Sequence, residues 1–398
     1  MKDYLYDINQ LKKYVENELN SIYEYFKQNN TEMIVELCIS MQQKIINIGT
    51  LLENEYGLEN TSILRVLEIM CEVCYRCVEN NISVETFISV IKYKIQEFEY
   101  CYAWSIPKDS YDLSIVAIVK NEKYIIEWIE YHLLVGVNHF YIYDNDSTDG
   151  LKDKLKKYID TGIVTYIYYP GKYIQVQSYI DAIQNFKYNT KWLAIIDGDE
   201  YLMPMEDGKK LPQILDEIKS NYEANSEYLV NIGYVGAIGV NWRTYGTSGH
   251  KIACEGLCIE NYKYRAEDEH FQNVHIKSIV NPRVVTEMYN PHFVYLKEGY
   301  RCISEKGSNI QGPYFYDSIC CKLRINHYIS KSEQELREKI KRGWPDRDID
   351  MDIEKEIYEM SVNCSKVFDY SMEKYVEEVK KRVNLWYLIK IQCIFTMK

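Results

Sequence analysis

The central part of the chain alternates between short apolar runs and segments whose apolar residues recur at helical spacing. Short runs rich in β-branched residues predict strands buried on both faces, and longer segments with a period near 3.6 predict amphipathic helices. The predicted strands are 113–119, 139–143, 164–168 and 193–196, and the helices between them are 125–134, 151–158 and 174–186. This alternation predicts a parallel sheet with right-handed crossovers and helices on both faces.

The two ends of the chain have a different, mainly helical pattern. Apolar stripes such as 33–52 and 63–78 come with no catalytic constellation, which predicts an all-helical accessory domain over 1–104. The central α/β domain is expected over 112–330, because strand-like runs at 228–232 and 278–280 continue after the regular alternation ends. A charged helix over 331–345 opens with Ser332-Glu333-Gln334-Glu335, which resembles a capping box. It begins a helical extension over 331–398 that is expected to pack on the central domain.

Charge and composition exclude several classes of protein. The net charge of −12 over 398 residues argues against a nucleic-acid binder and against general adhesion to anionic lipid. The first 28 residues are charged and carry no apolar leader segment, and no apolar run reaches the length of a membrane span. We therefore expect a cytoplasmic location. The short apolar stretch 383–395 follows three basic residues, so it could contact the inner face of a membrane or pack on the protein body.

The twelve cysteines fit reduced thiols in a cytosol. Cys71, Cys74 and Cys77 have the spacing that opens a zinc or iron–sulfur site, but no second pair follows at zinc spacing. The fourth position of a ferredoxin-type run is Asn81. A buried stripe on one side of a helix is the favoured interpretation.

The most informative chemistry follows the last predicted strand, where Asp197 and Asp199 flank Gly198. Ligands of open α/β sheets bind beyond the carboxyl ends of strands. If the backbone bends at Gly198, both carboxylates can converge on one hard cation. The alternative is a plain turn in which Asp and Gly supply only turn chemistry.

Several common nucleotide and nucleophile motifs are absent. The first βα unit lacks G-x-G-x-x-G, and neither G-x-x-x-x-G-K-[ST] nor G-x-S-x-G occurs. The sequence therefore does not support a Rossmann dinucleotide site, a P-loop or a hydrolase nucleophile elbow.

Four segments in order carry a resemblance to one family. They are 119–132 (with Val-Lys-Asn-Glu), 136–149 (ending Asp-Asn-Asp-Ser-Thr-Asp), 197–202 (Asp-Gly-Asp-Glu-Tyr-Leu) and 242–250, followed by shorter matches at 277–282, 291–293, 325–328 and 342–343. Together they resemble glycosyltransferase family 92 and its bacterial relatives, which are related to family 2 glycosyltransferases. The resemblance covers about residues 112–346.

This resemblance implies a GT-A-type, Rossmann-like mixed sheet, a nucleotide-sugar donor (a UDP-sugar before others), Mn²⁺ or Mg²⁺, and inversion at the anomeric carbon. Family 92 contains galactosyltransferases, but its bacterial relatives are less uniform, so the donor sugar stays open.

The same resemblance gives the candidate site residues their roles. Asp199 is expected to ligate the metal directly, and Asp197 to contact the metal through water or to bind the ribose. His327 is the expected histidine ligand, with His292 as second choice and a buried core histidine as the alternative. Asn121, Glu122, Asp144, Asn145 and Lys277 are expected to bind the nucleotide, with Lys277 countering the diphosphate or serving only as surface charge. Asp149 could contact the donor or cap the helix that begins at Leu151.

The acceptor side of the site is the least defined. The glycines of 242–250 permit close approach to a ligand, so this loop, with His250 as a catalytic candidate, is expected to line donor sugar and acceptor. The alternative is a tight structural loop. Asp346 is the preferred general base, with Glu305 and Asp317 as other candidates.

The predicted function is metal-dependent transfer of a hexose to a glycan or lipid-linked acceptor in surface-polysaccharide or glycoconjugate synthesis. One alternative is a non-catalytic glycan-binding or scaffold protein with a degenerate transferase fold. Another is a nucleotidyltransferase, although the first βα junction lacks the Gly-rich basic loop that would hold a triphosphate.

Overall fold

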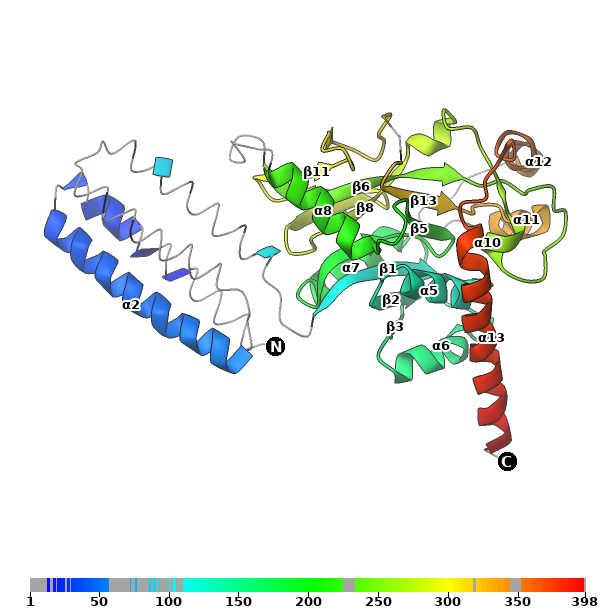
Figure 1. Ribbon diagram of the computed structural model, residues 1–398, viewed down its shortest axis with the longest axis horizontal. Coiled ribbons are helices and arrows are strands. Elements are labelled where there is room, and N and C mark those ends of the chain that lie inside the picture. Colours follow the sequence, from blue (N-terminus) through cyan, green and yellow to red (C-terminus); the bar gives the residue numbers. More distant parts are fainter. Residues whose placement is uncertain are drawn as a thin grey trace. The chain divides into compact units, whose positions relative to one another are not determined.

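The computed structural model describes residues 111–224, 233–317, 320–343 and 352–396, together with the helix α2 (Thr31–Tyr56) and scattered positions elsewhere in the first 110 residues. The chain divides into two compact units. One comprises Met1–Ser110 with Tyr228–Tyr234, and the other comprises Tyr111–Glu227 with Val235–Lys398 (Figure 1). The C-terminal residues therefore belong to the same unit as the central sheet.

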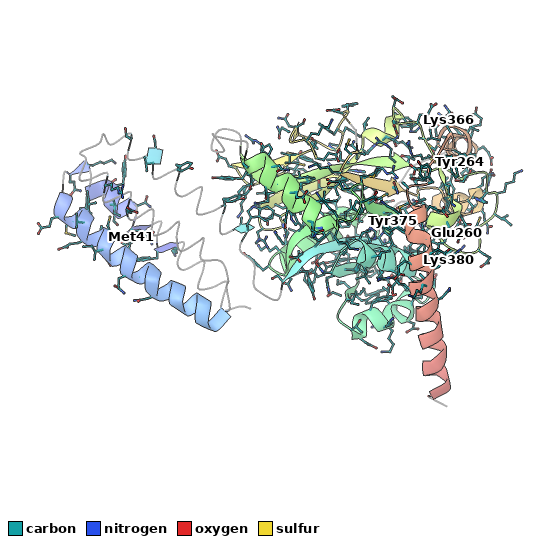
Figure 2. The ribbon with its side chains drawn as sticks, viewed as in Figure 1. Met41, Glu260, Tyr264, Lys366, Tyr375 and Lys380 are labelled. Carbon is teal, nitrogen blue, oxygen red and sulfur yellow. The ribbon has the colours of Figure 1, made fainter. Side chains whose placement is uncertain are left out.

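In the first unit, α2 confirms the predicted apolar stripe at 33–52. Ile34, Cys38 and Met41 are buried at helical spacing, and Met41 is labelled in Figure 2. The predicted stripe at 63–78, with Cys71, Cys74 and Cys77, lies outside the described residues.

The parallel half of the sheet agrees with the predicted alternation. Its elements are β1 (Tyr111–Val119), α5 (Ile125–Leu134), β2 (His139–Asp144), α6 (Leu151–Asp160), β3 (Val164–Tyr168), α7 (Gln175–Phe186) and β4 (Thr190–Ile195). β1 lies between β2 and β4 and is parallel to both, and β3 is parallel to β2. Gly136, with φ of 105°, follows the C-cap of α5, as predicted for a helix stop.

Helices cover both faces of these strands, because alternate side chains point to opposite sides. Val116 and Ile118 pack in one cluster with Tyr179 of α7. On the other side, Trp128 of α5 contacts Phe140 of β2, with ring centroids 5.5 Å apart. The predicted α/β fold with a mixed sheet and helices on both faces is confirmed.

The antiparallel half extends this sheet beyond β4. In the described part of the unit the main sheet has ten strands, in the order β12-β11-β6-β8-β4-β1-β2-β3, with β5 and β13 attached at β6. The added elements are β5 (Glu200–Pro204), α8 (Leu211–Ala224), β6 (Tyr234–Thr244), β8 (Ile276–Val280), β11 (Tyr300–Ile303), β12 (Asn309–Ile310) and β13 (Leu323–His327). Residues 225–232, where a strand was predicted at 228–232, lie outside the described residues.

Strand β13 is the element that completes the site. It runs antiparallel to β5 and parallel to β6, with His327 opposite both Glu200 and Thr244. This register carries a histidine more than a hundred residues away in sequence to the turn that holds Asp197 and Asp199.

Shorter elements connect these strands. They are α10 (Cys258–Asn261), the 3₁₀ turn Phe271–Val274, the hairpin β9 (Val285–Asn290) with β10 (Phe293–Leu296), and the two-residue pair β7 (Tyr264–Arg265) with β14 (Val367–Phe368). The β7–β14 pair joins the C-terminal segment to the loop that follows β6.

The C-terminal region contains α11 (Glu333–Arg342), α12 (Ile353–Tyr358), a π-helical turn (Glu359–Asn363) and α13 (Glu373–Thr396). The predicted capping box of α11 is confirmed, with Ser332 and Glu335 exchanging side-chain and backbone hydrogen bonds. α13 packs on α5, where the rings of Tyr131 and Tyr375 lie 5.2 Å apart, and Lys380 pairs with Glu260 of α10 (Figure 2). Among the described residues, no helix combines the length and apolar composition needed to cross a membrane.

Candidate active site

The candidate site lies at one edge of the sheet, where three parallel strands end. Val119 at the end of β1 is paired with Asp144 of β2, and Val116 is paired with Ile195 of β4. Because parallel strands end on the same side, this edge gathers Asn121, Asp144 and the Asp197 turn.

Asp197 is enclosed by side chains from α7 and β8. Its Oδ1 accepts hydrogen bonds from Gln175 Nε2 at 2.8 Å and Tyr179 Oη at 2.6 Å, and its Oδ2 accepts one from Lys277 Nζ at 2.9 Å. Burial alone would raise the pKa of Asp197, but the Lys277 ammonium outweighs it and lowers that pKa. Asp197 is thus a fixed carboxylate anion whose side chain is 25% exposed.

Glu200 and Lys277 are fully buried next to this turn. Neither side chain is exposed to solvent, and Lys277 Nζ lies 3.5 Å from Glu200 Oε2, which also accepts a hydrogen bond from the Asp197 amide. Burial raises the pKa of Glu200 to about 8 despite the lysine. Lys277 was predicted to counter a diphosphate, but its ammonium is held by Asp197 in the interior, so it acts on the turn and not on the surface.

The structure gives Gly198 a different role from the predicted one. It is not among the glycines with positive φ, so no left-handed bend occurs there. A Cβ at this position would lie 3.0 Å from Val119 Cγ1, which is tighter than ordinary packing. The glycine allows the turn to lie directly against the end of β1.

Asp199 and His327 meet as the resemblance implies. His327 Nε2 lies 3.6 Å from Asp199 Oδ1, and the backbone N–H of Tyr328 donates to the Asp199 carbonyl at 2.9 Å. The His327 ring packs against Trp242, with centroids 4.2 Å apart. The strand β13 and the Trp242 indole together fix the imidazole beside the carboxylate.

A lysine from α11 holds the second oxygen of this carboxylate. Lys339 Nζ lies 2.5 Å from Asp199 Oδ2. Burial would raise the pKa of Asp199, but Lys339, His327 and Lys331 together outweigh it and hold that pKa well below its usual range. Burial lowers the pKa of His327, and Asp199 only partly offsets this, so the imidazole is neutral near pH 7.

Asp199 and His327 fit a divalent ion. A neutral imidazole can ligate, and the ring atom that faces Asp199 is Nε2, while Nδ1 is buried without a hydrogen-bond partner among the described residues. Two ligand atoms on one octahedral ion, each about 2.1 Å from it, lie roughly 3 Å apart, so a small side-chain shift closes the observed 3.6 Å. A carboxylate with an imidazole suits Mn²⁺ better than Mg²⁺, which prefers oxygen alone. Both carboxylate oxygens of Asp197 have protein partners, and its metal or ribose role stays a prediction.

The predicted nucleotide-binding residues are gathered at the edge but are engaged with the protein. Asn121 has a φ of 53°, and its side chain accepts from the Thr148 amide at 2.7 Å. Glu122 binds Lys331 Nζ at 2.6 Å. These contacts join the loops after β1, β2 and β13, and the nucleotide roles of both residues stay predictions.

The loop after β2 is held in a similar way. Asp144 accepts from the Ser147 amide at 2.8 Å and from Tyr166 Oη at 2.5 Å, and Asn145 Oδ1 accepts from the Gly171 amide at 3.1 Å. Asp149 pairs with Lys154, and the N-cap of α6 is Gly150, without a side-chain cap. The capping alternative for Asp149 is therefore wrong.

The other histidine candidates have structural contacts. His292 Nδ1 lies 3.0 Å from the carbonyl of Ile276, and burial lowers the pKa of His292 to about 3. His250 Nε2 lies 3.2 Å from the carbonyl of Asn261. Among the base candidates, Glu305 accepts from three consecutive backbone amides at 321–323, and Asp346 lies outside the described residues.

The glycine-containing segment 242–250 has two parts with different surroundings. Trp242 belongs to β6 and faces His327, whereas Gly246 packs against the C-terminal segment. A Cβ on Gly246 would lie 2.1 Å from the Met360 carbonyl oxygen and 2.5 Å from that of Cys364. At Gly246 the tight structural loop, and not close approach to a ligand, explains the glycine.

Replacing Gly246 with Ala should therefore destabilise the protein by roughly 3 kcal/mol, because backbone must move to admit the methyl group. Chemical denaturation measures this. Gly312 is the matched control, since it has no positive φ and a Cβ there would meet nothing within 4 Å. A Gly246→Ala protein as stable as Gly312→Ala would contradict the packing argument.

Four functional candidates were not found from sequence. Gln175 and Tyr179 hold Asp197 from α7, and Lys331 and Lys339 hold Glu122 and Asp199 from around α11. The i, i+4 spacing of Gln175 and Tyr179 on the helix leading into the Asp197 strand was an available signal.

A second group of metal-ligating side-chain types consists of His270, Glu359 and Cys364. His270 caps the 3₁₀ turn, and its Nδ1 accepts from the Gln272 amide, so its proton is on Nε2, 2.9 Å from Glu359 Oε1. Burial raises the pKa of the Cys364 thiol to about 12. A protonated Nε2 and a neutral thiol make this group a structural hydrogen-bond cluster.

In open α/β sheets, ligands bind beyond the carboxyl ends of the strands, which is where these acidic side chains lie. The chain matches the sequence model of glycosyltransferase family 92 over residues 116–381. It belongs to this family, which confirms the resemblance and, with the mixed sheet, the GT-A-type fold class.

Individual relatives are distant. A glycosyltransferase family 92 protein of Ricinus communis is 26% identical over 243 residues, which cover 57% of this chain and 40% of that protein. The beta-1,4-galactosyltransferase galt-1 of Caenorhabditis elegans is 23% identical over 276 residues, covering 65% of this chain and 60% of that protein. The chain thus spans less than two thirds of either relative. A crystal structure of S. aureus TarS in complex with UDP is 12% identical, with a TM-score of 0.28, and covers 43% of this chain and 47% of that one.

Proposed function

We propose that this protein is a metal-dependent glycosyltransferase that moves a hexose from a nucleotide-sugar, a UDP-sugar before others, to a glycan or lipid-linked acceptor. We propose inversion at the anomeric carbon and a role in surface-polysaccharide or glycoconjugate synthesis. The observation that carries the proposal is the Asp199–His327 pair at the edge where three parallel strands end, in a chain of family 92. A relative named as a galactosyltransferase supports a hexose as the transferred group.

The residues at this edge of the sheet have separate tasks in the proposed reaction. Asp199 and His327 would hold the ion, which when bound neutralises the charge that develops on the departing diphosphate. Lys277 keeps Asp197 ionised and fixed, and Asp197 in turn precedes Asp199 by two residues in the turn between β4 and β5. The acceptor hydroxyl must also lose a proton, for which Asp346 stays the predicted base.

The test is donor turnover by the purified full chain. A panel of nucleotide-sugars is screened by thermal shift with Mn²⁺, and the ligands that raise the melting temperature are then assayed for nucleotide release. We expect at least one UDP-hexose to stabilise the protein and to be hydrolysed slowly without acceptor, with loss of both effects in EDTA. Binding without any release would favour the scaffold alternative, and absence of binding by every donor would contradict the proposal.

The cytoplasmic location predicted from the sequence is kept as part of this proposal. We do not propose contact with a membrane through 383–395. The side chains after residue 384 lie outside the described part, and no described surface points to lipid. Separation of soluble and membrane fractions of the producing cell, followed by immunodetection of the chain, tests the location. Detection only in the membrane fraction would contradict it.

A further inference from the structure

Lys339 differs from the other lysines around the candidate site in its access to solvent. Its side chain is 20% exposed and pairs with Asp199, whereas Lys277, on Asp197, is 0% exposed. The side chain of Lys331, at 2.6 Å from Glu122, is 12% exposed. Of these three lysines, Lys339 has the most exposed side chain, and so the easiest access to a ligand that arrives from solvent.

The helix that carries Lys339 is anchored at both ends beside this edge. Its N-terminus has the Ser332–Glu335 capping box, and near its C-terminus Arg342 Nη1 donates to the carbonyl of Lys120, directly after β1, at 2.7 Å. Lys339 Nζ also lies 3.2 Å from the carbonyl of Ile329. The backbone of α11 is thus fixed, and the flexible lysine stem provides the freedom to reach from Asp199 toward a neighbouring anion.

The charges at the edge are balanced before any ligand arrives. Lys277 pairs with Asp197, Lys339 with Asp199 and Lys331 with Glu122. A free divalent ion that approaches Asp199 therefore meets a carboxylate whose charge is already compensated by an ammonium 2.5 Å away. An ion that arrives with a nucleoside diphosphate also brings the anion that Lys339 can bind.

We propose that Lys339 exchanges between Asp199 and the donor diphosphate, so that the site takes the metal–nucleotide complex in preference to the free ion. This inference rests on the proposed function and adds a positioning residue to it. While the site is free, the ammonium holds the metal-binding carboxylate in place. When the metal–nucleotide complex binds, the Lys339 ammonium leaves Asp199 and contacts the phosphate oxygens. One charge-assisted hydrogen bond then replaces the other.

The experiment compares Lys339→Met with Lys341→Met, an exposed lysine of the same helix. Methionine keeps the aliphatic stem and removes the charge. Mn²⁺ binding alone is measured by electron paramagnetic resonance, and binding of UDP and UMP in saturating Mn²⁺ by calorimetry. For Lys339→Met we expect Mn²⁺ alone to bind several-fold more tightly, and UDP to bind about tenfold or more weakly, because a charge-assisted contact is lost. UMP, which lacks the second phosphate, should lose less, and Lys341→Met should match the wild type.

Two results would overturn the inference: unchanged or weaker Mn²⁺ binding in Lys339→Met, or an equal loss for UDP and UMP. A merely structural lysine would lower the melting temperature and weaken all three ligands together, which thermal denaturation of both variants reveals. A wild-type protein that binds Mn²⁺ but neither uridine nucleotide would contradict the proposed donor as well. Failure of the Lys339 variant alone leaves the proposed function intact.

Discussion

Replacing Asp199 with Asn should lower nucleotide release and glycosyl transfer by about 10³-fold or more while the protein stays folded. Asn keeps the shape of the side chain but removes the negative charge that would hold a divalent ion beside His327. Loss of the ion removes several kcal/mol of stabilisation from the departing diphosphate, and each 1.36 kcal/mol is tenfold in rate. Turnover of the stabilising UDP-hexose in excess Mn²⁺ measures the loss, and circular dichroism confirms the fold.

Asp207→Asn is the matched control, because the Asp207 side chain is 90% exposed and its partner is Lys374 at the surface. It should leave turnover unchanged. Retention of turnover by Asp199→Asn, with metal supplied, would mean that the residue does not serve the chemistry, and the assignment of this edge as the active site would fail.

The strands and helices of the parallel half could be predicted because their signal is local. β3 has the predicted bounds, and α5 begins and ends where the apolar period does. β1 and β4 begin two to three residues earlier than predicted, at Tyr111 and Thr190, because polar residues at these positions still join the ladder between them. Backbone pairing, and not hydrophobicity, decides where a strand starts.

The acidic pair was predictable for a related reason, since Asp197 and Asp199 directly follow a buried strand. The side chains that pair with these two aspartates and lower their pKa could not be predicted. Lys339 and Lys341 look alike in a charged helix, and only the fold shows that one binds Asp199 while the other is exposed. Gly246 likewise shows no sign in the sequence of its contact with Met360 and Cys364, more than a hundred residues away.

One carboxylate of the C-terminal segment, Asp369, contacts two arginines of the central domain. Its Oδ2 lies 2.7 Å from Arg265 Nε in β7 and 3.1 Å from Arg324 Nη1 in β13. Asp369 and Arg324 are each 7% exposed at the side chain, and Arg324 also donates to Ser371. One carboxylate therefore joins the strand that carries His327 to the segment that precedes α13.

Replacing Asp369 with Ala should destabilise the protein by about 3–5 kcal/mol, because the buried Arg324 loses its counter-charge and Arg265 keeps only Asp268, 2.7 Å from its Nη1. Burial alone would raise the pKa of Asp369, but Arg324, Ser371 and Arg265 outweigh it and hold that pKa well below its usual range. A carboxyl with a depressed folded-state pKa stabilises the protein fully above its unfolded pKa of about 4, and this contribution is lost as the pH falls through the folded value.

Urea denaturation of the wild type, Asp369→Ala and Asp207→Ala between pH 7 and pH 3 measures both effects. At pH 7 only Asp369→Ala should unfold at a clearly lower urea concentration, and its difference from the wild type should narrow as the pH falls below about 4. Equal midpoints for the three proteins at pH 7 would show that the Asp369–arginine contacts do not stabilise the fold. A difference that stays constant with pH would instead assign the loss to packing and not to charge.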